Sequence, residues 1–113
     1  PLAEARNEQR LQQVFKYVQE DFAKGISLRE AAQRAHLSVS AFCKFFKKAT
    51  GKTFSDYVNE ARITHACTLL LETDKPIGMV AEASGFENLA YFNRVFLKKK
   101  EATPGQWRRR VGR

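Results

Sequence analysis

The chain has 113 residues, a length that fits one compact domain and excludes two ordinary ones. Its net charge of +8 favours an anionic partner, such as nucleic acid or an anionic membrane surface. Two separated cysteines exclude a disulfide framework and a zinc site and fit a reducing cytoplasm, while no apolar run is long enough to cross a membrane.

Most of the positive charge lies in two segments. Residues 27–50 carry a net charge of +4 and residues 94–113 carry +7, while residues 51–93 sum to −3. Such basic segments are either solvated or form a surface for a polyanion. For the arginines within residues 108–113 both interpretations stay open.

The first two elements are predicted to be helices. Apolar residues recur at helical spacing over residues 7–24, and Gly25 follows where a C-terminal cap belongs. Ser27 and Glu30 then have the spacing of a capping box, in which Ser27 accepts from a backbone N–H and Glu30 reaches back to the N-cap. This start predicts a short helix that runs to about Ala35.

A tight turn at His36 and Leu37 separates this helix from a third one. Ser38 is in position to cap the third helix, and Gly51 is in position to end it. An apolar stripe gives the helix one buried face, formed by Val39, Phe42, Phe45 and Phe46. Residues 27–50 are therefore predicted to form a helix-turn-helix unit.

The second half of the chain starts with a long helix. Thr53 resembles a cap, and apolar spacing continues over residues 53–73, which predicts a linker helix. A further helix is bounded by Pro76 and Gly85, and another begins at about Leu89. The last helix has Thr103 as its N-cap and Pro104 at its first helical position. No segment alternates like a half-buried strand, so the predicted fold class is all-α, with seven helices and no sheet.

The two halves of the chain repeat each other. A shift of fifty residues aligns Phe42 with Phe92 and Phe46 with Phe96, and a shift of forty-nine aligns the residues upstream of the turn. The second unit covers residues 77–100, and its turn is one residue longer. Two copies are too few for a solenoid, so we predict two homeodomain-like helix-turn-helix units joined by the linker helix.

Small residues where two helices cross let a recognition helix approach closely, and both units have them. They are Ala31, Ala32 and Ala35 in the first unit and Ala81, Ala83 and Ser84 in the second. Residues that project away from the phenylalanine stripes then face the bases of a duplex. The base-facing candidates are Ser40, Ala41, Cys43, Lys44, Leu89, Ala90, Tyr91, Asn93 and Arg94.

The second recognition helix carries the more informative side chains. Arg94 can form a bidentate fork with guanine, Asn93 can pair with adenine, and Tyr91 can pack on a thymine methyl group. The first helix offers fewer directional donors, so weaker base discrimination is expected there. The candidates for phosphate contact are Ser38, Lys47, Lys48, Asn88, Lys98, Lys99 and Thr103, although each single lysine also fits a solvated position.

Other reactive side chains are assigned structural roles. Arg62 suits a buried salt bridge better than a DNA contact, and Cys43 suits a small neutral filler better than a redox switch. His36 and His65 have no second ligand at metal spacing. Nothing forms a nucleophile–base pair, a phosphate-binding glycine loop or a carboxylate dyad, so we expect no enzyme, no metal and no cofactor.

Several short motifs, in order and at fixed spacing, resemble one family. They are Ala32-x-x-Ala35-x-Leu37-Ser38, residues 46–51, Ile77-x-x-Val80-Ala81-x-x-x-Gly85-Phe86, Tyr91-Phe92-x-Arg94-x-Phe96 and Thr103-Pro104. Over residues 11–107 the chain resembles the DNA-binding domain of the AraC/XylS family of bacterial transcription regulators.

The resemblance implies two recognition helices in successive major grooves on one face of double-stranded DNA. It also implies a cytoplasmic transcription regulator, most often an activator, that works with RNA polymerase. The start at Pro1 favours a fragment of residues 1–113 that lacks an N-terminal sensor or dimerisation domain, through which a small-molecule effector would act; we expect no membrane partner. Glu101 stands where the family has glycine, so a different turn is expected there.

Two other functions remain open from the sequence. A helical protein-interaction module would bind an acidic partner through the basic faces and show no preference among duplexes. Non-specific binding through residues 98–113 would show a steep dependence on salt. The alanines at the helix crossings and the two basic recognition helices favour sequence-specific DNA binding.

Overall fold

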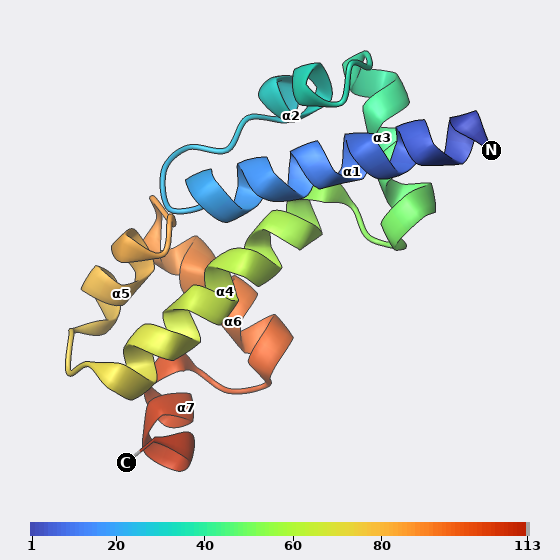
Figure 1. The fold of residues 1–113 in the computed structure, drawn as a ribbon. Coiled ribbons are helices and arrows are strands. Elements are labelled where there is room, and N and C mark those ends of the chain that lie inside the picture. The colour runs from blue at the N-terminus through green and yellow to red at the C-terminus, as the bar shows by residue number, and fades with distance from the viewer. Residues whose placement is uncertain (113) are drawn as a thin grey trace. The chain divides into compact units, whose positions relative to one another are not determined.

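The computed structural model describes residues 1–112, which form helices and short turns (Figure 1). The helices are α1 (Leu2–Asp21), α2 (Leu28–Arg34), α3 (Val39–Thr50), α4 (Phe54–Glu72), α5 (Ile77–Ala83), α6 (Leu89–Lys100) and α7 (Pro104–Val111). These residues contain seven helices and no strand, which confirms the predicted all-α class. Within the same range, no helix has the length and apolar character needed to cross a membrane.

The chain forms two compact units, divided between Val58 and Asn59. The first holds α1, α2, α3 and the first turn of α4; the second holds the rest of α4 with α5, α6 and α7. Each unit buries its own set of apolar side chains, whereas the length of the chain alone suggests a single core. The continuous helix α4 therefore contributes to two cores.

Aromatic side chains fill the core of the first unit. Phe42 and Phe46 of α3 are fully buried, and Phe46 meets Phe54 and Tyr57 of α4 edge-on, with ring centroids 5.5 Å apart in both pairs. Phe15 of α1 lies 6.3 Å from Phe46, also edge-on. Such pairs contribute about 0.5–1.5 kcal/mol beyond their buried area, so α3 is held from both α1 and α4.

The second unit repeats this packing at equivalent positions. Phe92 and Phe96 of α6 are fully buried, and Trp107 of α7 meets Phe96 edge-on at 6.0 Å, as Tyr57 meets Phe46. The same cluster includes Ile63, Ala66 and Leu70 of α4. The repeat seen in the sequence is therefore a repeat of side-chain contacts as well.

The turn of each helix-turn-helix unit is closed by an equivalent backbone hydrogen bond. The N–H groups of Leu37 and Phe86 donate to the carbonyls of Ala32 and Ala81, both at 3.0 Å. The residue before each donor has a positive φ, 59° at His36 and 98° at Gly85. Because a left-handed conformation costs a residue other than glycine about 1–2 kcal/mol, packing of the flanking helices must hold His36 there.

Helix α1 differs from the predicted range of residues 7–24. It starts at Leu2 and ends at Asp21, and its C-cap is Phe22 in a right-handed conformation rather than Gly25. The early start gives no periodic signal because residues 1–9 are all exposed, so this part of the helix buries no face. Residues with high helix propensity, such as Leu, Ala, Glu and Arg, carry the helix through that stretch.

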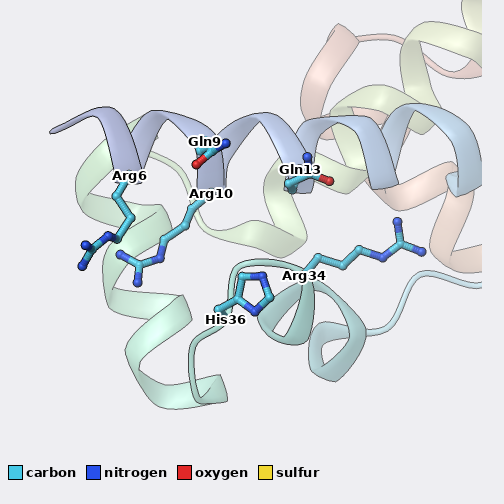
Figure 2. Close-up of a pocket in the computed structure, with 6 residues that line it drawn as sticks. All are labelled: Arg6, Gln9, Arg10, Gln13, Arg34 and His36. Carbon is cyan, nitrogen blue, oxygen red and sulfur yellow. The ribbon is translucent and has the colours of Figure 1, made fainter. Parts of the chain in front are cut away.

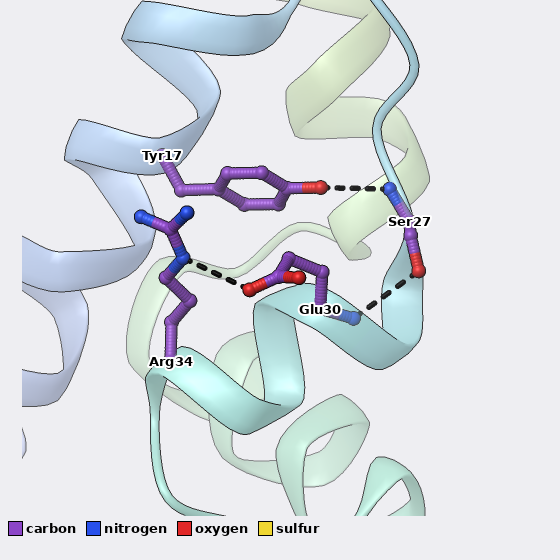
Figure 3. Close-up of polar contacts among 4 residues, drawn as sticks. All are labelled: Tyr17, Ser27, Glu30 and Arg34. Carbon is purple, nitrogen blue, oxygen red and sulfur yellow. Dashed lines mark hydrogen bonds and ion pairs between the residues drawn. The ribbon is translucent and has the colours of Figure 1, made fainter.

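The start of α2 keeps only one half of the predicted capping box (Figure 3). The Ser27 hydroxyl accepts from the Glu30 N–H at 3.1 Å, as predicted. The Glu30 carboxylate instead pairs with Arg34 at 3.1 Å, and the Ser27 N–H donates to the Tyr17 hydroxyl at 3.0 Å. Since the Arg34 guanidinium also lies 4.7 Å from the centre of the Tyr17 ring, these contacts tie α2 to α1.

Glu101 ends α6 in the same way as Gly51 ends α3. Both residues are left-handed, with φ of 57° and 79°, and the N–H of each donates a 2.8 Å hydrogen bond to the carbonyl four residues earlier. The different turn expected from glutamate at this position is therefore absent. Glutamate takes the glycine conformation at a cost that glycine avoids.

Ser84, the C-cap of α5, is fully buried at the helix crossing of the second unit. Its hydroxyl has no hydrogen-bond partner among residues 1–112. The equivalent residue of the first unit, Ala35, is also fully buried and has no hydroxyl to satisfy. Ala83, which the sequence places at this crossing, is exposed, so Ala81 and Ser84 are the small buried residues there.

We predict that Ser84→Ala raises the free energy of unfolding by about 1 kcal/mol, because a buried hydroxyl without a partner loses its hydration uncompensated. The matched reverse change, Ala35→Ser, should lower it by about 1–3 kcal/mol. Urea denaturation followed by circular dichroism measures both changes. A clear loss of stability in Ser84→Ala would mean that the hydroxyl is satisfied.

Candidate nucleic-acid interface

One face of α3 is exposed and polar because the opposite face is buried. Phe42 and Phe46 direct that opposite face into the core of the first unit. The hydroxyl of Ser38 caps the helix by accepting from the Ala41 N–H at 3.2 Å. The base-facing candidates of this helix are all exposed: Ser40, Ala41, Cys43 and Lys44.

Helix α6 presents larger polar groups on its exposed face. Its N-cap is Asn88, whose side-chain oxygen accepts from the Tyr91 N–H at 2.9 Å. The base-facing candidates here are also exposed: Leu89, Ala90, Tyr91, Asn93 and Arg94. Ser38 and Asn88 thus occupy helix N-termini, where free N–H groups and the helix dipole favour an anion such as phosphate.

Tyr91 is anchored to α4. Its hydroxyl accepts a hydrogen bond from Asn59 Nδ2 at 2.8 Å, and Asn59 is only 7% exposed. The Arg94 guanidinium carbon lies 5.5 Å from the centre of the Tyr91 ring, within the range of a cation–π contact. Asn59 therefore fixes the ring, and the ring orients Arg94 on the exposed face of α6.

Arg62 of α4 is half-buried beside Phe86 in the second unit. Its guanidinium carbon lies 5.9 Å from the centre of the Phe86 ring. Burial lowers the pKa of Arg62, while the neighbouring Tyr91 and Glu87 act in the opposite direction. Arg62 is half-buried against the Phe86 ring and is not part of the exposed face of α6.

The lysines predicted to contact phosphates differ in their surroundings. Lys48 and Lys98 are exposed, and so is Lys47, whose Nζ donates at 3.3 Å to the carbonyl that follows the end of α3. Lys99 is half-buried and lines a hollow together with Glu60 of α4. Lys99 is therefore the least open of the four to a DNA backbone.

Two residues near α7 are engaged in holding the fold. Thr103 and Gln106 form a complete capping box, with hydrogen bonds of 3.2 and 3.0 Å. The Thr103 hydroxyl, a predicted phosphate contact, therefore serves as the N-cap of α7. Arg108 donates to the carbonyls of Leu70 and Thr73 at 3.0 and 3.2 Å. It therefore caps the end of α4 and is not part of a solvated tail; Arg113 of that tail lies outside the described residues.

No candidate metal centre accompanies this surface. Across residues 1–112, no group of three or more His, Cys, Asp or Glu side chains is placed to hold a metal ion. Cys43 is an exposed free thiol on α3, and Cys67 is a half-buried one on α4. Burial raises the pKa of the Cys67 thiol, which favours its protonated form.

Three side chains that organise this region belong to no sequence motif. Arg10, Asn59 and Arg108 each bind a partner far along the chain, with Arg10 Nε donating to the Ala35 carbonyl at 3.0 Å. Such pairs have no fixed local spacing, so a motif cannot reveal them. No local signal marks Asn59 either, because it stands between Val58 and the charged Glu60.

We predict that Tyr91→Phe lowers the free energy of unfolding by about 1–3 kcal/mol, because the buried Asn59 amide loses its acceptor. Asn59→Ala should then lower the free energy of unfolding by less in the Tyr91→Phe background than in the original chain, with a coupling energy of about 1 kcal/mol. Urea denaturation followed by the fluorescence of Trp107, the single tryptophan, measures the cycle. Simple additivity of the two costs would contradict the contact.

Known proteins share this sequence pattern and fold. The uncharacterized HTH-type transcriptional regulator YijO of Escherichia coli is 31% identical over 105 residues, which cover 93% of this chain and 37% of that protein. The HTH-type transcriptional activator RhaR of Klebsiella pneumoniae is 43% identical over 65 residues, which cover 58% of this chain and 23% of that protein. The chain thus spans well under half of either relative.

A solved structure extends the likeness to the fold. The C-terminal domain of AraT, a response regulator from Geobacillus stearothermophilus, has a TM-score of 0.85 and 27% identity, and the match covers 92% of this chain and 87% of that chain. A family model described as a helix-turn-helix domain matches residues 31–110, which is most of the chain. The chain therefore belongs to the AraC/XylS-type helix-turn-helix family.

Proposed function

We propose that this chain binds double-stranded DNA sequence-specifically, as part of a bacterial transcription regulator that acts as an activator. The observation that carries the proposal is the repeated unit, in which two buried phenylalanines direct one polar face of α3 or α6 outward. Membership of the family, and relatives named as transcriptional regulators and activators, support it.

In this proposal α3 and α6 each enter a major groove, and successive grooves on one face of DNA lie about 34–36 Å apart. Arg94 forms a bidentate contact with guanine and Asn93 pairs with adenine. The Tyr91 ring contacts both the Arg94 guanidinium and a thymine methyl group, because the Tyr91 hydroxyl is already bound by Asn59. The exposed lysines Lys48 and Lys98 bind phosphates.

The two units are proposed to differ in how much sequence they read. Arg94 is oriented by an anchored aromatic ring, which lowers the entropy lost when it binds a base. The exposed face of α3 offers Lys44 and small side chains, and Lys44 is a flexible point charge without a planar fork. Base discrimination therefore comes mainly from α6, and α3 adds affinity through the backbone.

The rest of the proposal concerns the longer protein. In this proposal the activator contacts RNA polymerase, and a small-molecule effector would act through an N-terminal sensor or dimerisation domain outside this chain. Residues 1–113 are then its DNA-binding domain, with helix-turn-helix units near residues 27–50 and 77–100. Its location is the bacterial cytoplasm, where the DNA is, and its activity is binding without catalysis.

Selection from a random duplex library should enrich an asymmetric motif with two short elements about 10 bp apart, since each helix reads one major groove. The enriched duplex is then titrated at two salt concentrations alongside a scrambled duplex of the same length. If nothing is enriched and all binding disappears as the salt concentration rises, the chain is a non-specific binder instead.

We predict that Arg94→Ala costs about 1–3 kcal/mol on the selected duplex and relaxes the preference at one base pair. Lys98→Ala, which removes the same charge from the same helix, should weaken all duplexes alike and reduce the salt slope by about one. A repeated selection with each variant separates the two effects. An unchanged motif for Arg94→Ala would remove Arg94 as a base reader.

A further inference from the structure

A groove in the first unit lies between α1 and the turn that follows α2 (Figure 2). It has a volume of about 570 Å³, which is within the range of sites that bind ligands. Its lining residues are Arg6, Gln9, Arg10, Gln13, Arg34 and His36. No sequence motif predicts this groove, and none of the proposed DNA contacts uses it.

The lining of the groove is cationic. It contains three guanidinium groups, of which that of Arg34 is paired with the Glu30 carboxylate, so Arg6 and Arg10 supply its unpaired positive charge. The acidic residues of the same stretch of α1, Glu4 and Glu8, each precede an arginine by two positions, which places them about 200° around the helix. Glu4 and Glu8 therefore lie on the side of α1 away from the groove.

Two of the three arginines are held in place by the protein. Arg10 donates to the Ala35 carbonyl at 3.0 Å and to the Asn7 side chain at 3.1 Å, which leaves three of its five N–H donors for a ligand. Arg34 is fixed by Glu30 and by the ring of Tyr17 (Figure 3). An anion arriving in the groove therefore meets donors whose positions are already set.

The opposite rim of the groove is open. Arg6 and Gln9 are exposed, and neither side chain has a hydrogen-bond or ion-pair partner among residues 1–112. Both come from the first nine residues of the chain, all of which are exposed. This part of α1 thus presents a charged face that nothing in the first unit covers.

The location of the groove separates it from the face of α3 that is proposed to read DNA. Helix α1 packs on the buried side of α3, where Phe15 meets Phe46, while Ser40 and Lys44 are exposed on the other side. A duplex bound to that exposed face leaves the α1 wall of the groove available to another partner.

We propose that this groove binds an acidic segment of a protein. Guanidinium groups bind carboxylates through paired, charge-assisted hydrogen bonds, and Arg6 and Arg10, one helical turn apart on α1, match a segment with adjacent carboxylates. The amides of Gln9 and Gln13 each offer both a donor and an acceptor, which suits the peptide groups of such a segment better than a bare phosphate. The groove is thus a docking site whose lining residues are separate from the proposed DNA contacts.

The test is a titration of the isotope-labelled chain with an acetylated and amidated hexaglutamate peptide at about 0.15 M salt, where distant charges are screened, followed by NMR. We expect saturable shifts of the amide signals of Gln9, Arg10, Gln13 and His36, and no such shifts with hexaglutamine. The double variant Arg6→Gln/Gln9→Glu changes two residues that hold no structural contact, so the fold is retained. It should weaken hexaglutamate binding at least about tenfold, since a bidentate ion pair is lost and a like charge is added.

The control variant is Lys24→Gln/Lys75→Gln, which changes the net charge by the same amount at exposed residues outside the groove. Because distant surface charges are screened, its affinity for hexaglutamate should stay within about twofold of the original. Shifts confined to α6 and α7, or equal losses in both variants, would overturn the proposal. So would a loss of DNA affinity with a reduced salt slope in Arg6→Gln/Gln9→Glu, which would assign the groove to DNA phosphates.

Discussion

The pair of buried phenylalanines on each recognition helix is the interaction on which the rest of the structure depends. Phe42 and Phe46 of α3, like Phe92 and Phe96 of α6, lie four residues apart and are fully buried. Each ring contributes about 1.5–3 kcal/mol on burial, compared with about 1 kcal/mol for a capping side chain. The rings therefore decide which face of each helix is turned inward. The exposed polar faces follow from that choice, because residues on the other side of a helix cannot reach the core.

Helix α4 runs through both units and so links them covalently. Its first turn, with Phe54 and Tyr57, closes the first core as α7 and Trp107 close the second. Its later residues, from Asn59 onward, pack in the second unit as α1 packs in the first. One continuous helix thus ends one repeat and begins the next. Arg108 stabilises its C-terminus by binding two of the carbonyls that a helix end leaves without partners.

The functional differences between the units arise at equivalent positions of the repeat. Arg10 and Asn59 stand forty-nine residues apart, and each sends a polar side chain from the first helix of its unit to a later element. Asn59 binds Tyr91 and so orients Arg94 on the recognition helix. Arg10 binds the carbonyl at the end of α2 and so becomes one wall of a cationic groove. The same place in the fold thus supports the proposed DNA reading in one unit and the proposed docking site in the other.

The sequence by itself determined the all-α class, the two helix-turn-helix units, most caps and the buried phenylalanine stripes, because these depend on local propensity and on spacing within one helix. It also identified the exposed candidates on α3 and α6, whose contacts with DNA remain a prediction. Only the tertiary structure decided the early start of α1, the partner of Glu30, the anchoring of Tyr91 by Asn59, the capping role of Arg108 and the groove beside Arg10. Each of these pairs a side chain with a group that the local pattern does not specify, or extends a helix through residues that bury no side chain, so no spacing in the sequence encodes it.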